Sequence, residues 1–133
     1  MRPDLRILIA AVAGALAAWT WSRAVETPPM PLVRIAELQI EPAQLAAYTT
    51  AVKEEIQASV RVEPGVLAIY AVAEKDNPTR LRFFEIYADE AAYQAHRQSP
   101  HFRKYFETTQ SMIASRKLVE TVPVQLSAKP QGF

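Results

Sequence analysis

The stretch "VLAIYAVAEKDNPTRLRFFEIYA", residues 66–88, decides the fold of this 133-residue chain. Its two runs rich in β-branched and aromatic residues, 66–75 and 79–88, are typical of β-strands. "DNP" at 76–78 separates the runs and consists of residues that favour turns. The stretch therefore predicts an antiparallel hairpin, and the elements on either side determine the sheet to which the hairpin belongs.

A strand and a helix are predicted before the hairpin. "VRIAELQI" (33–40) alternates in the manner of a strand, and from 43 to about 62 apolar residues recur at helical steps of three or four. "EPG" (63–65) ends the helix, because proline cannot continue it and glycine tolerates a positive φ at the exit. The expected apolar stripe is Leu45, Tyr48, Val52, Ile56 and Ser59, with Lys53, Glu54, Glu55 and Gln57 pointing elsewhere.

Two helices and a strand are predicted after the hairpin. An acid-rich first turn starts a short helix at 89–98, and Ser99-Pro100 has the pattern of an N-cap followed by proline at the first helical position. The next helix carries an apolar stripe that runs to Ile113. A last strand is expected at 117–126, followed by a loose tail at 127–133.

The element order β-α-β-β-α-β, with its second helix broken in two, predicts an α+β fold of the ferredoxin-like type over residues 33–126. In the hairpin strands, apolar residues occupy both the odd-numbered and the even-numbered positions, which point to opposite faces. This indicates that both faces of the sheet are covered. Helices cover one face, so a second copy of the chain is the simplest cover for the other. We therefore predict a homodimer.

The N-terminal residues differ from the rest of the chain. Two arginines precede the uncharged run "ILIAAVAGALAAWTW" (7–21), and small residues follow at a position suited to signal cleavage. Residues 1–24 are thus expected to be a cleaved signal peptide or, alternatively, an uncleaved membrane anchor, with a proline-rich linker at 25–32. Either reading predicts a periplasmic or secreted domain that contacts a membrane only through an uncleaved N-terminal segment.

Composition excludes several function classes. Removing 1–24 leaves 12 basic and 13 acidic side chains, with no basic run that would suit nucleic acid. The chain has no cysteine and only three glycines, so thiolate chemistry and glycine-rich phosphate loops are excluded. The two histidines, His96 and His101, lack the spacing of a helical zinc pair. We therefore expect neither a cofactor nor a metal.

Glu85 and His96 are the strongest catalytic candidates among the polar residues. Glu85 lies between Phe84 and Ile86 in mid-strand, where it either pairs with a cation such as Arg82 or Arg34, or orients a base or substrate hydroxyl. His96 could act as a base in a cavity between helix and sheet, or be a satisfied structural histidine.

For the other candidate residues, a structural role is an alternative to a functional one. His101 is at the second position of its helix, where capping or packing is the simpler role. Because the proline break puts the histidines on different helices, we do not expect them to form a pair. Phe102 and Tyr105 belong to an aromatic stripe that is either core or pocket wall.

The segment 62–105, with its E-P-G turn, its apolar strands and "AHRQSPHF" at 95–102, resembles the antibiotic biosynthesis monooxygenase domain, including quinol monooxygenases. The resemblance implies a dimeric α+β barrel, in which each subunit holds a pocket between sheet and helices. It also implies a cofactor-independent oxygenase that acts on a small aromatic or quinol-like substrate and O2. On this basis His96 is expected to be the base, Glu85 its partner or an orienter, and Tyr70, Arg82, His101, Phe102 and Tyr105 substrate-binding residues.

Besides a dimer of this fold with no retained chemistry, two alternatives stay open at this point. The first is a barrel that binds haem or a hydrophobic ligand without oxygenase activity, with His96 or His101 as axial ligand. The second is an isomerase of the same family, whose phosphorylated cytosolic substrate would suit an exported protein less well.

Overall fold

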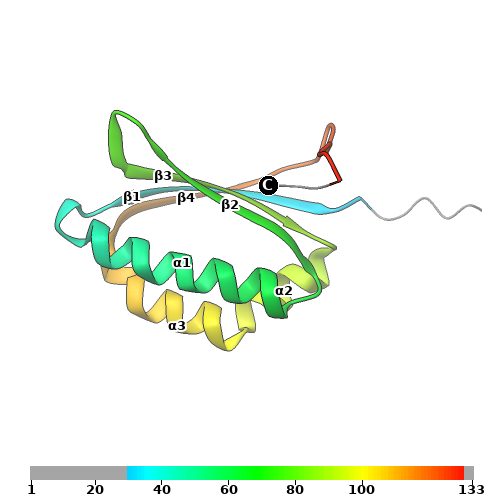
Figure 1. Ribbon diagram of the computed structural model, residues 1–133, viewed down its shortest axis with the longest axis horizontal. Helices are drawn as coiled ribbons and strands as arrows, with labels where there is room; N and C mark the ends of the chain where they lie inside the picture. The colour runs from blue at the N-terminus through cyan, green and yellow to red at the C-terminus, as the bar shows by residue number, and fades with distance from the viewer. Residues whose placement is uncertain (1–29, 131–133) are drawn as a thin grey trace, which may run out of the picture.

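The computed structural model describes residues 30–130, and the predicted β-α-β-β-α-β order is confirmed. Three helices pack on one side of a four-stranded sheet, as Figure 1 shows. Short 3-10 turns precede α1 and β4. The elements are β1 (Leu32–Ile40), α1 (Leu45–Val62), β2 (Val66–Glu74), β3 (Asn77–Tyr87), α2 (Glu90–Gln98), α3 (Pro100–Thr109) and β4 (Ile113–Glu120).

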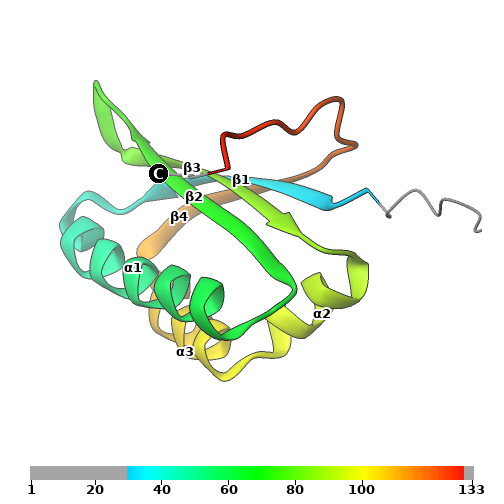
Figure 2. The ribbon, with the colours of Figure 1, turned by 45° about the vertical axis from the view of Figure 1, so that its right-hand side comes forward.

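The sheet has the strand order β2-β3-β1-β4, with every neighbouring pair antiparallel. This order belongs to the ferredoxin-like fold, in which each β-α-β unit places its two strands on either side of a strand from the other unit. Figure 2 shows α1 and the α2–α3 pair side by side beneath the sheet. The α+β ferredoxin-like prediction is confirmed.

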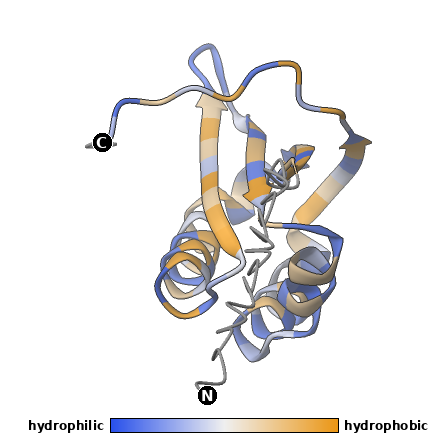
Figure 3. Ribbon diagram, turned by 90° about the vertical axis from the view of Figure 1, so that its right-hand side faces the viewer, coloured by the Kyte–Doolittle hydropathy of each residue, from blue (hydrophilic) through white to orange (hydrophobic). Residues whose placement is uncertain are grey.

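The hydrophobic core lies between the inner face of the sheet and the helices. Alternate strand residues point inward, which gives the strands the hydrophobic bands visible in Figure 3. The fully buried Tyr48 and Tyr87 join the helix layer to the sheet. The core cluster consists of Ala36, Leu38, Ile40, Tyr48, Val52, Val66, Ile69, Leu81, Phe83 and Tyr87.

Gly65 ends the α1–β2 turn for a reason different from the one expected. Its backbone does not adopt a positive φ. Instead, a Cβ added there would lie 2.5 Å from the Cβ of Ala92 in α2. The absence of a side chain thus allows the turn to pack directly against α2.

The break between α2 and α3 follows the predicted capping chemistry. The Asp89 carboxylate accepts a 2.8 Å hydrogen bond from the Ala92 backbone N–H and starts α2. Ser99 Oγ accepts from the Phe102 N–H at 3.2 Å, and Pro100 occupies the first turn of α3. These caps turn α3 so that the residues just after Ser99 approach the end of α1.

The predicted last strand was placed too late in the chain. β4 runs from Ile113 to Glu120 rather than over 117–126, so Ile113, which was expected to end the α3 stripe, already belongs to the strand. Pairing with β1 ends at Arg34 opposite Glu120. Beyond it, Thr121 bonds the Val33 carbonyl only through its side chain, and Pro123 has no N–H with which to continue a ladder.

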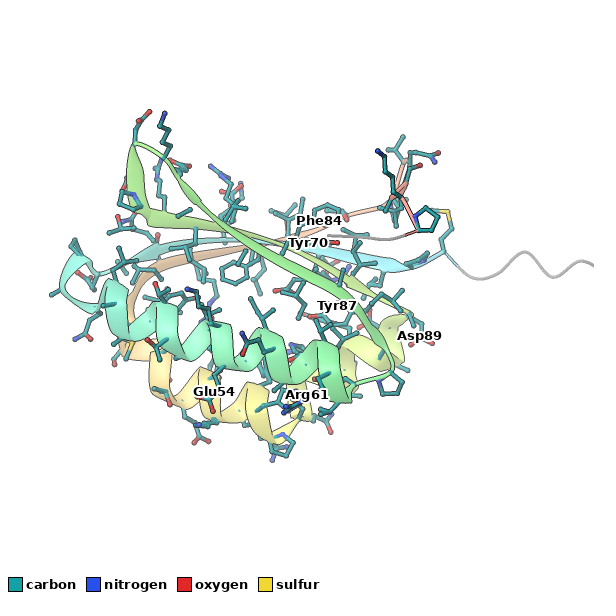
Figure 4. The ribbon with its side chains drawn as sticks, in the orientation of Figure 1. Glu54, Arg61, Tyr70, Phe84, Tyr87 and Asp89 are labelled. Atoms are coloured by element: carbon teal, nitrogen blue, oxygen red, sulfur yellow. The ribbon has the colours of Figure 1, made fainter. Side chains whose placement is uncertain are left out.

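The outer face of the sheet carries a row of apolar residues. Tyr70 lies opposite Phe84, and Phe84 opposite Ile35, which in turn pairs with Val119. Tyr70 and Phe84 are 45% and 37% exposed. Figure 4 shows both on the side of the sheet away from the helices, whereas Tyr87 lies between sheet and helices.

The predicted signal or anchor at 1–24 lies outside the described residues. The predicted linker at 25–32 falls only partly within them. Its last predicted residue, Leu32, is the first residue of β1. Among residues 30–130 no helix has the length and apolar character that crossing a membrane requires.

Candidate functional site

A pocket lies between the inner face of the sheet and helices α2 and α3. Its volume is about 130 Å³, close to that of an apolar cavity that holds one benzene ring. Aromatic and aliphatic side chains form most of the wall, and the polar groups come from several different elements. The lining residues that bear on its chemistry are Glu55, Glu85, Tyr87, His96, Tyr105 and Arg116.

Glu63, the residue that ends α1, joins the two histidines. Its Oε1 lies 3.0 Å from His96 Nδ1 and is also hydrogen-bonded to His101 Nε2. The break does place the histidines on different helices, as expected, but the expectation that they do not form a pair is wrong, because both contact Glu63. The break turns α3 so that His101 meets the same carboxylate that His96 contacts from α2.

Glu55 reaches the same cluster from one turn earlier in α1. Its Oε1 accepts a 2.6 Å hydrogen bond from Ser59 Oγ and lies 3.6 Å from His96 Nε2. Glu55 and His96 are 6% and 3% exposed. The prediction that Glu55 points away from the apolar stripe is wrong, because the residue lies one turn before Ser59 on the buried side of the helix.

Burial and hydrogen bonding set the charges of this cluster. Desolvation raises the pKa of Glu55 to about 7 and lowers the pKa of His96, although Glu63 partly offsets the effect on His96. Burial alone would raise the pKa of Glu63, but hydrogen bonds from the two histidines outweigh it and lower that pKa. Glu63 is therefore the ionised carboxylate of the cluster, and His96 is neutral near pH 7.

Glu85 lies on the inner face of β3 and pairs with a tyrosine, not with a cation. Tyr87 Oη donates a 2.9 Å hydrogen bond to Glu85 Oε2. Burial raises the pKa of the Glu85 carboxyl, and the Tyr87 hydrogen bond opposes that shift only in part. The expected cation partners are used elsewhere, because Arg34 pairs with Glu90 and Arg82 with Glu37 and Glu74.

A second hydrogen-bonded pair, formed by two tyrosines, lies on the α1–α3 side of the pocket. The hydroxyls of Tyr48 and Tyr105 are 2.7 Å apart, and burial raises the pKa of both, so both stay protonated. The Arg116 guanidinium lies over the Phe106 ring at 5.4 Å from its centroid. The pocket thus combines a neutral imidazole, protonated phenols, two carboxyls and the two cations Arg97 and Arg116 with a largely apolar wall.

The structure brings together most, but not all, of the predicted site residues. His96, Glu85, Phe102 and Tyr105 line the pocket. His101 is not among the pocket-lining residues, but it is hydrogen-bonded to Glu63, which also contacts His96. Tyr70 and Arg82 are instead on the outer face of the sheet. Alternate strand residues point to opposite faces, so Arg82 and the Tyr70–Phe84 pair lie on the face opposite to Phe83 and Glu85.

Two functional residues were missed by sequence reasoning. Glu55 had a usable signal, since it is three residues after Val52 and four before Ser59 and so falls on the apolar stripe. Glu63 had none, because a glutamate before Pro-Gly is typical of an exposed turn. Only the packing of α2 and α3 against the end of α1 makes it a buried hydrogen-bond acceptor.

Comparisons with known proteins give a family. The family model described as antibiotic biosynthesis monooxygenase matches residues 31–108. No functionally curated protein matches the sequence.

Solved structures agree with the family model. A protein of Bacteroides thetaiotaomicron named for antibiotic biosynthesis monooxygenases is 45% identical, over 74% of this chain and 94% of its own, with a TM-score of 0.72. A protein of Lactobacillus acidophilus named as a monooxygenase is 32% identical, over 66% of this chain and 42% of its own, with a TM-score of 0.65. One from Nitrosomonas europaea is 24% identical, over 71% and 99% of the two chains, with a TM-score of 0.67, and it supports the fold alone.

The family model spans more than half of the chain, and the Bacteroides protein shares nearly half of the aligned residues over most of both chains. The fold, the inner-face pocket and these matches agree, and the chain belongs to the antibiotic biosynthesis monooxygenase family.

Proposed function

We propose that this protein is an exported, cofactor-independent monooxygenase that acts on a quinol or a similarly electron-rich phenol. One observation supports this most directly. His96 is a buried, neutral imidazole whose Nδ1 is bonded to Glu63, which leaves Nε2 as the basic nitrogen at a pocket of single-ring size. Removing a phenolic proton in such a pocket is the step that prepares the substrate for O2.

The overall reaction balances without another reductant. A hydroquinone and O2 give a hydroxyquinone and water. One oxygen atom enters a ring C–H position. The other leaves as water, with its electrons and protons supplied by the substrate, and so the substrate provides all four electrons that O2 accepts.

His96 is the proposed base in this reaction. Its Nδ1–H donates to Glu63, so Nε2 carries the lone pair that accepts the phenolic proton. The imidazolium that forms is stabilised by the ionised Glu63, as the carboxylate does in a catalytic triad. Glu63 is thus a positioning residue, and His101 supports its orientation.

Tyr105 is the proposed donor to the substrate anion. When Tyr48 donates to Tyr105 across their 2.7 Å contact, the Tyr105 hydroxyl proton is available to a substrate oxygen in the pocket. The Arg116 charge supports the same anion. Glu85, held by Tyr87, is positioned to receive the second hydroxyl of a quinol.

The homodimer is part of this proposal. The outer-face row of Tyr70, Phe84, Ile35 and Val119 is apolar and offers a face on which a second sheet could pack. In such a dimer Tyr70 and Arg82 would belong to the interface rather than to the pocket. Export rests on the N-terminal sequence alone, and detecting the mature protein in a periplasmic or culture fraction tests it.

The decisive experiment is oxygen uptake by chelator-treated protein with a panel of hydroquinones and electron-rich phenols. Consumption of one O2 per substrate, with a single ¹⁸O atom from ¹⁸O2 in the product, is the expected result. The His96→Gln variant should lose the activity while the exposed Glu54→Gln control retains it. Absence of uptake with every phenol in the panel would refute the proposal.

The haem-binding alternative has less support. A cavity the size of one benzene ring does not hold a porphyrin. A haemin titration that gives no Soret shift would agree with this.

A further inference from the structure

Glu55, His96 and His101 form a cluster of metal-ligand type at the junction of the three helices. Each offers one ligand atom, and these atoms all lie within 4.8 Å of one another. Glu55 comes from α1, His96 from α2 and His101 from α3. The sequence does not reveal the cluster, because the three residues meet only through the helix packing.

The His96–Glu55 pair of the cluster lies near the ligand spacing of a small transition-metal ion. Ligand atoms at about 2.0–2.1 Å from a tetrahedral metal are roughly 3.3 Å from each other. His96 Nε2 and Glu55 Oε1 are 3.6 Å apart and are not hydrogen-bonded to each other. A side-chain adjustment of less than 1 Å would bring this pair to the ligand spacing.

The groups around the cluster also resemble those of a metal site. A metal-binding histidine usually donates its second ring N–H to a carboxylate, which fixes the tautomer and directs the other nitrogen at the metal. His96 has this arrangement, with Nδ1 on Glu63 and Nε2 toward Glu55. Ser59 Oγ in turn holds the Glu55 oxygen at 2.6 Å.

The charge balance favours a cation at the same place. Glu55 and Glu63 are two largely buried carboxyls, and among residues 30–130 neither forms an ion pair with a lysine or arginine. Buried carboxylates are unfavourable unless a cation or a proton compensates them. With neutral imidazoles, a divalent ion would balance both charges.

We propose that Glu55, His96 and His101 bind a divalent transition metal of the Zn²⁺ or Co²⁺ class, with Glu63 orienting His96. Two imidazoles and one carboxylate favour such metals over Mg²⁺ or Ca²⁺, which take oxygen ligands. The site goes beyond the proposed oxygenase function. Because the metal and the substrate proton would compete for His96 Nε2, the metal-loaded enzyme would be inhibited.

The test is titration of the untagged full-length protein with Co²⁺, followed by its visible absorption, and then displacement by Zn²⁺ in calorimetry. The chain has only these two histidines and no cysteine, so no other imidazole and no thiolate in this sequence can give rise to a Co²⁺ band. One equivalent should bind. Glu55→Gln and His101→Ala should each weaken binding at least 100-fold, and Glu63→Gln about 10–100-fold.

Glu54→Gln is the matched control, because Glu54 is the exposed neighbour of Glu55 and pairs with Lys104. This variant should bind Co²⁺ as the parent does. A parent protein that shows no Co²⁺ band at one equivalent overturns the proposal whether or not any variant folds. Equal binding by the parent, Glu55→Gln and His101→Ala, with native circular dichroism, overturns it as well.

The binding measurement is independent of the oxygenase proposal, because it needs no substrate. In an active preparation, Zn²⁺ should inhibit oxygen uptake, and chelator should restore it. Co²⁺ binding without any oxygen uptake would leave the metal site standing and reject the oxygenase alone.

Discussion

His96 Nδ1 lies 3.0 Å from Glu63 Oε1, and this contact joins the short helix α2 to the C-cap residue of α1. Because a neutral imidazole has one N–H, a donor role at Nδ1 leaves Nε2 as the acceptor. One hydrogen bond thus determines which nitrogen of the ring is available for chemistry.

This contact predicts graded effects on catalysis. His96→Gln should lower kcat for quinol oxidation by about 10²–10⁴-fold, the contribution typical of a general base. Glu63→Gln should have a smaller effect, because the base is kept while its orientation and imidazolium partner are weakened. Steady-state oxygen uptake measures both, and a Glu63→Gln loss exceeding that of His96→Gln would contradict the assigned roles.

Glu55 predicts a pH-dependent stability. Its folded-state pKa is raised by burial from 4.5 to about 7, so its protonated form is favoured in the folded state. The folded protein then loses about 3 kcal/mol of unfolding free energy as pH rises from roughly 4.5 through 7, because the unfolded chain releases that proton more readily.

Glu55→Gln should therefore be more stable than the parent by up to about 3 kcal/mol at pH 8, with little difference at pH 4. Urea unfolding at several pH values, with chelator present, measures the difference. Glu54→Gln, at an exposed position, should show no such trend. A Glu55→Gln protein that is less stable than the parent at pH 8 would contradict the raised pKa.

The Tyr87–Glu85 hydrogen bond is expected to stabilise the fold. Tyr87→Phe removes the donor and leaves a buried carboxyl without its partner, which should lower the unfolding free energy by about 1–3 kcal/mol at neutral pH. In the Glu85→Leu background the same substitution should have a smaller effect. Thermal or urea unfolding of the four proteins gives the coupling energy, and a value near zero would mean that the contact does not stabilise the protein.

Gly65 is expected to tolerate no larger residue. In Gly65→Ala the new Cβ would meet Ala92 Cβ at 2.5 Å, and relieving that clash should lower the unfolding free energy by about 1–3 kcal/mol. Ala92→Gly should rescue part of the loss in the double variant, although glycine in α2 itself destabilises by about 1 kcal/mol. Strictly additive effects in the urea-unfolding cycle would show that the two positions do not touch.

The outer face predicts a dimer that a single charge disrupts. Phe84→Arg places a cation in the middle of the apolar row and should convert a dimer to a monomer at micromolar concentration, as measured by light scattering. Val60→Arg, at an exposed apolar position of α1 that is 49% accessible, is the control and should remain dimeric. A monomeric parent protein would disprove the predicted interface directly.

The sequence by itself determined the element order and hence the fold. The apolar, β-branched and aromatic runs within 66–88, the helical stripe beginning at Leu45 and the Ser99-Pro100 break are local patterns, each with its own chemical signature. The register of the hairpin was not predicted, and it places Glu85 and Phe83 on the inner face but Tyr70 and Arg82 on the outer face. The end of β4 was not predicted, because the pairing stops at Arg34 opposite Glu120 although β1 begins at Leu32.

Only the tertiary structure decided which polar residues meet. Glu55 looked like a solvent-facing helix residue and Glu63 like a turn residue, whereas Tyr70 and Arg82 looked like pocket residues. Side-chain proximity across three helices depends on interhelical packing, which no spacing within one element encodes. The sequence therefore specified the scaffold and the family, while the packing of α2 and α3 against the end of α1 produced the Glu63–His96–Glu55 cluster.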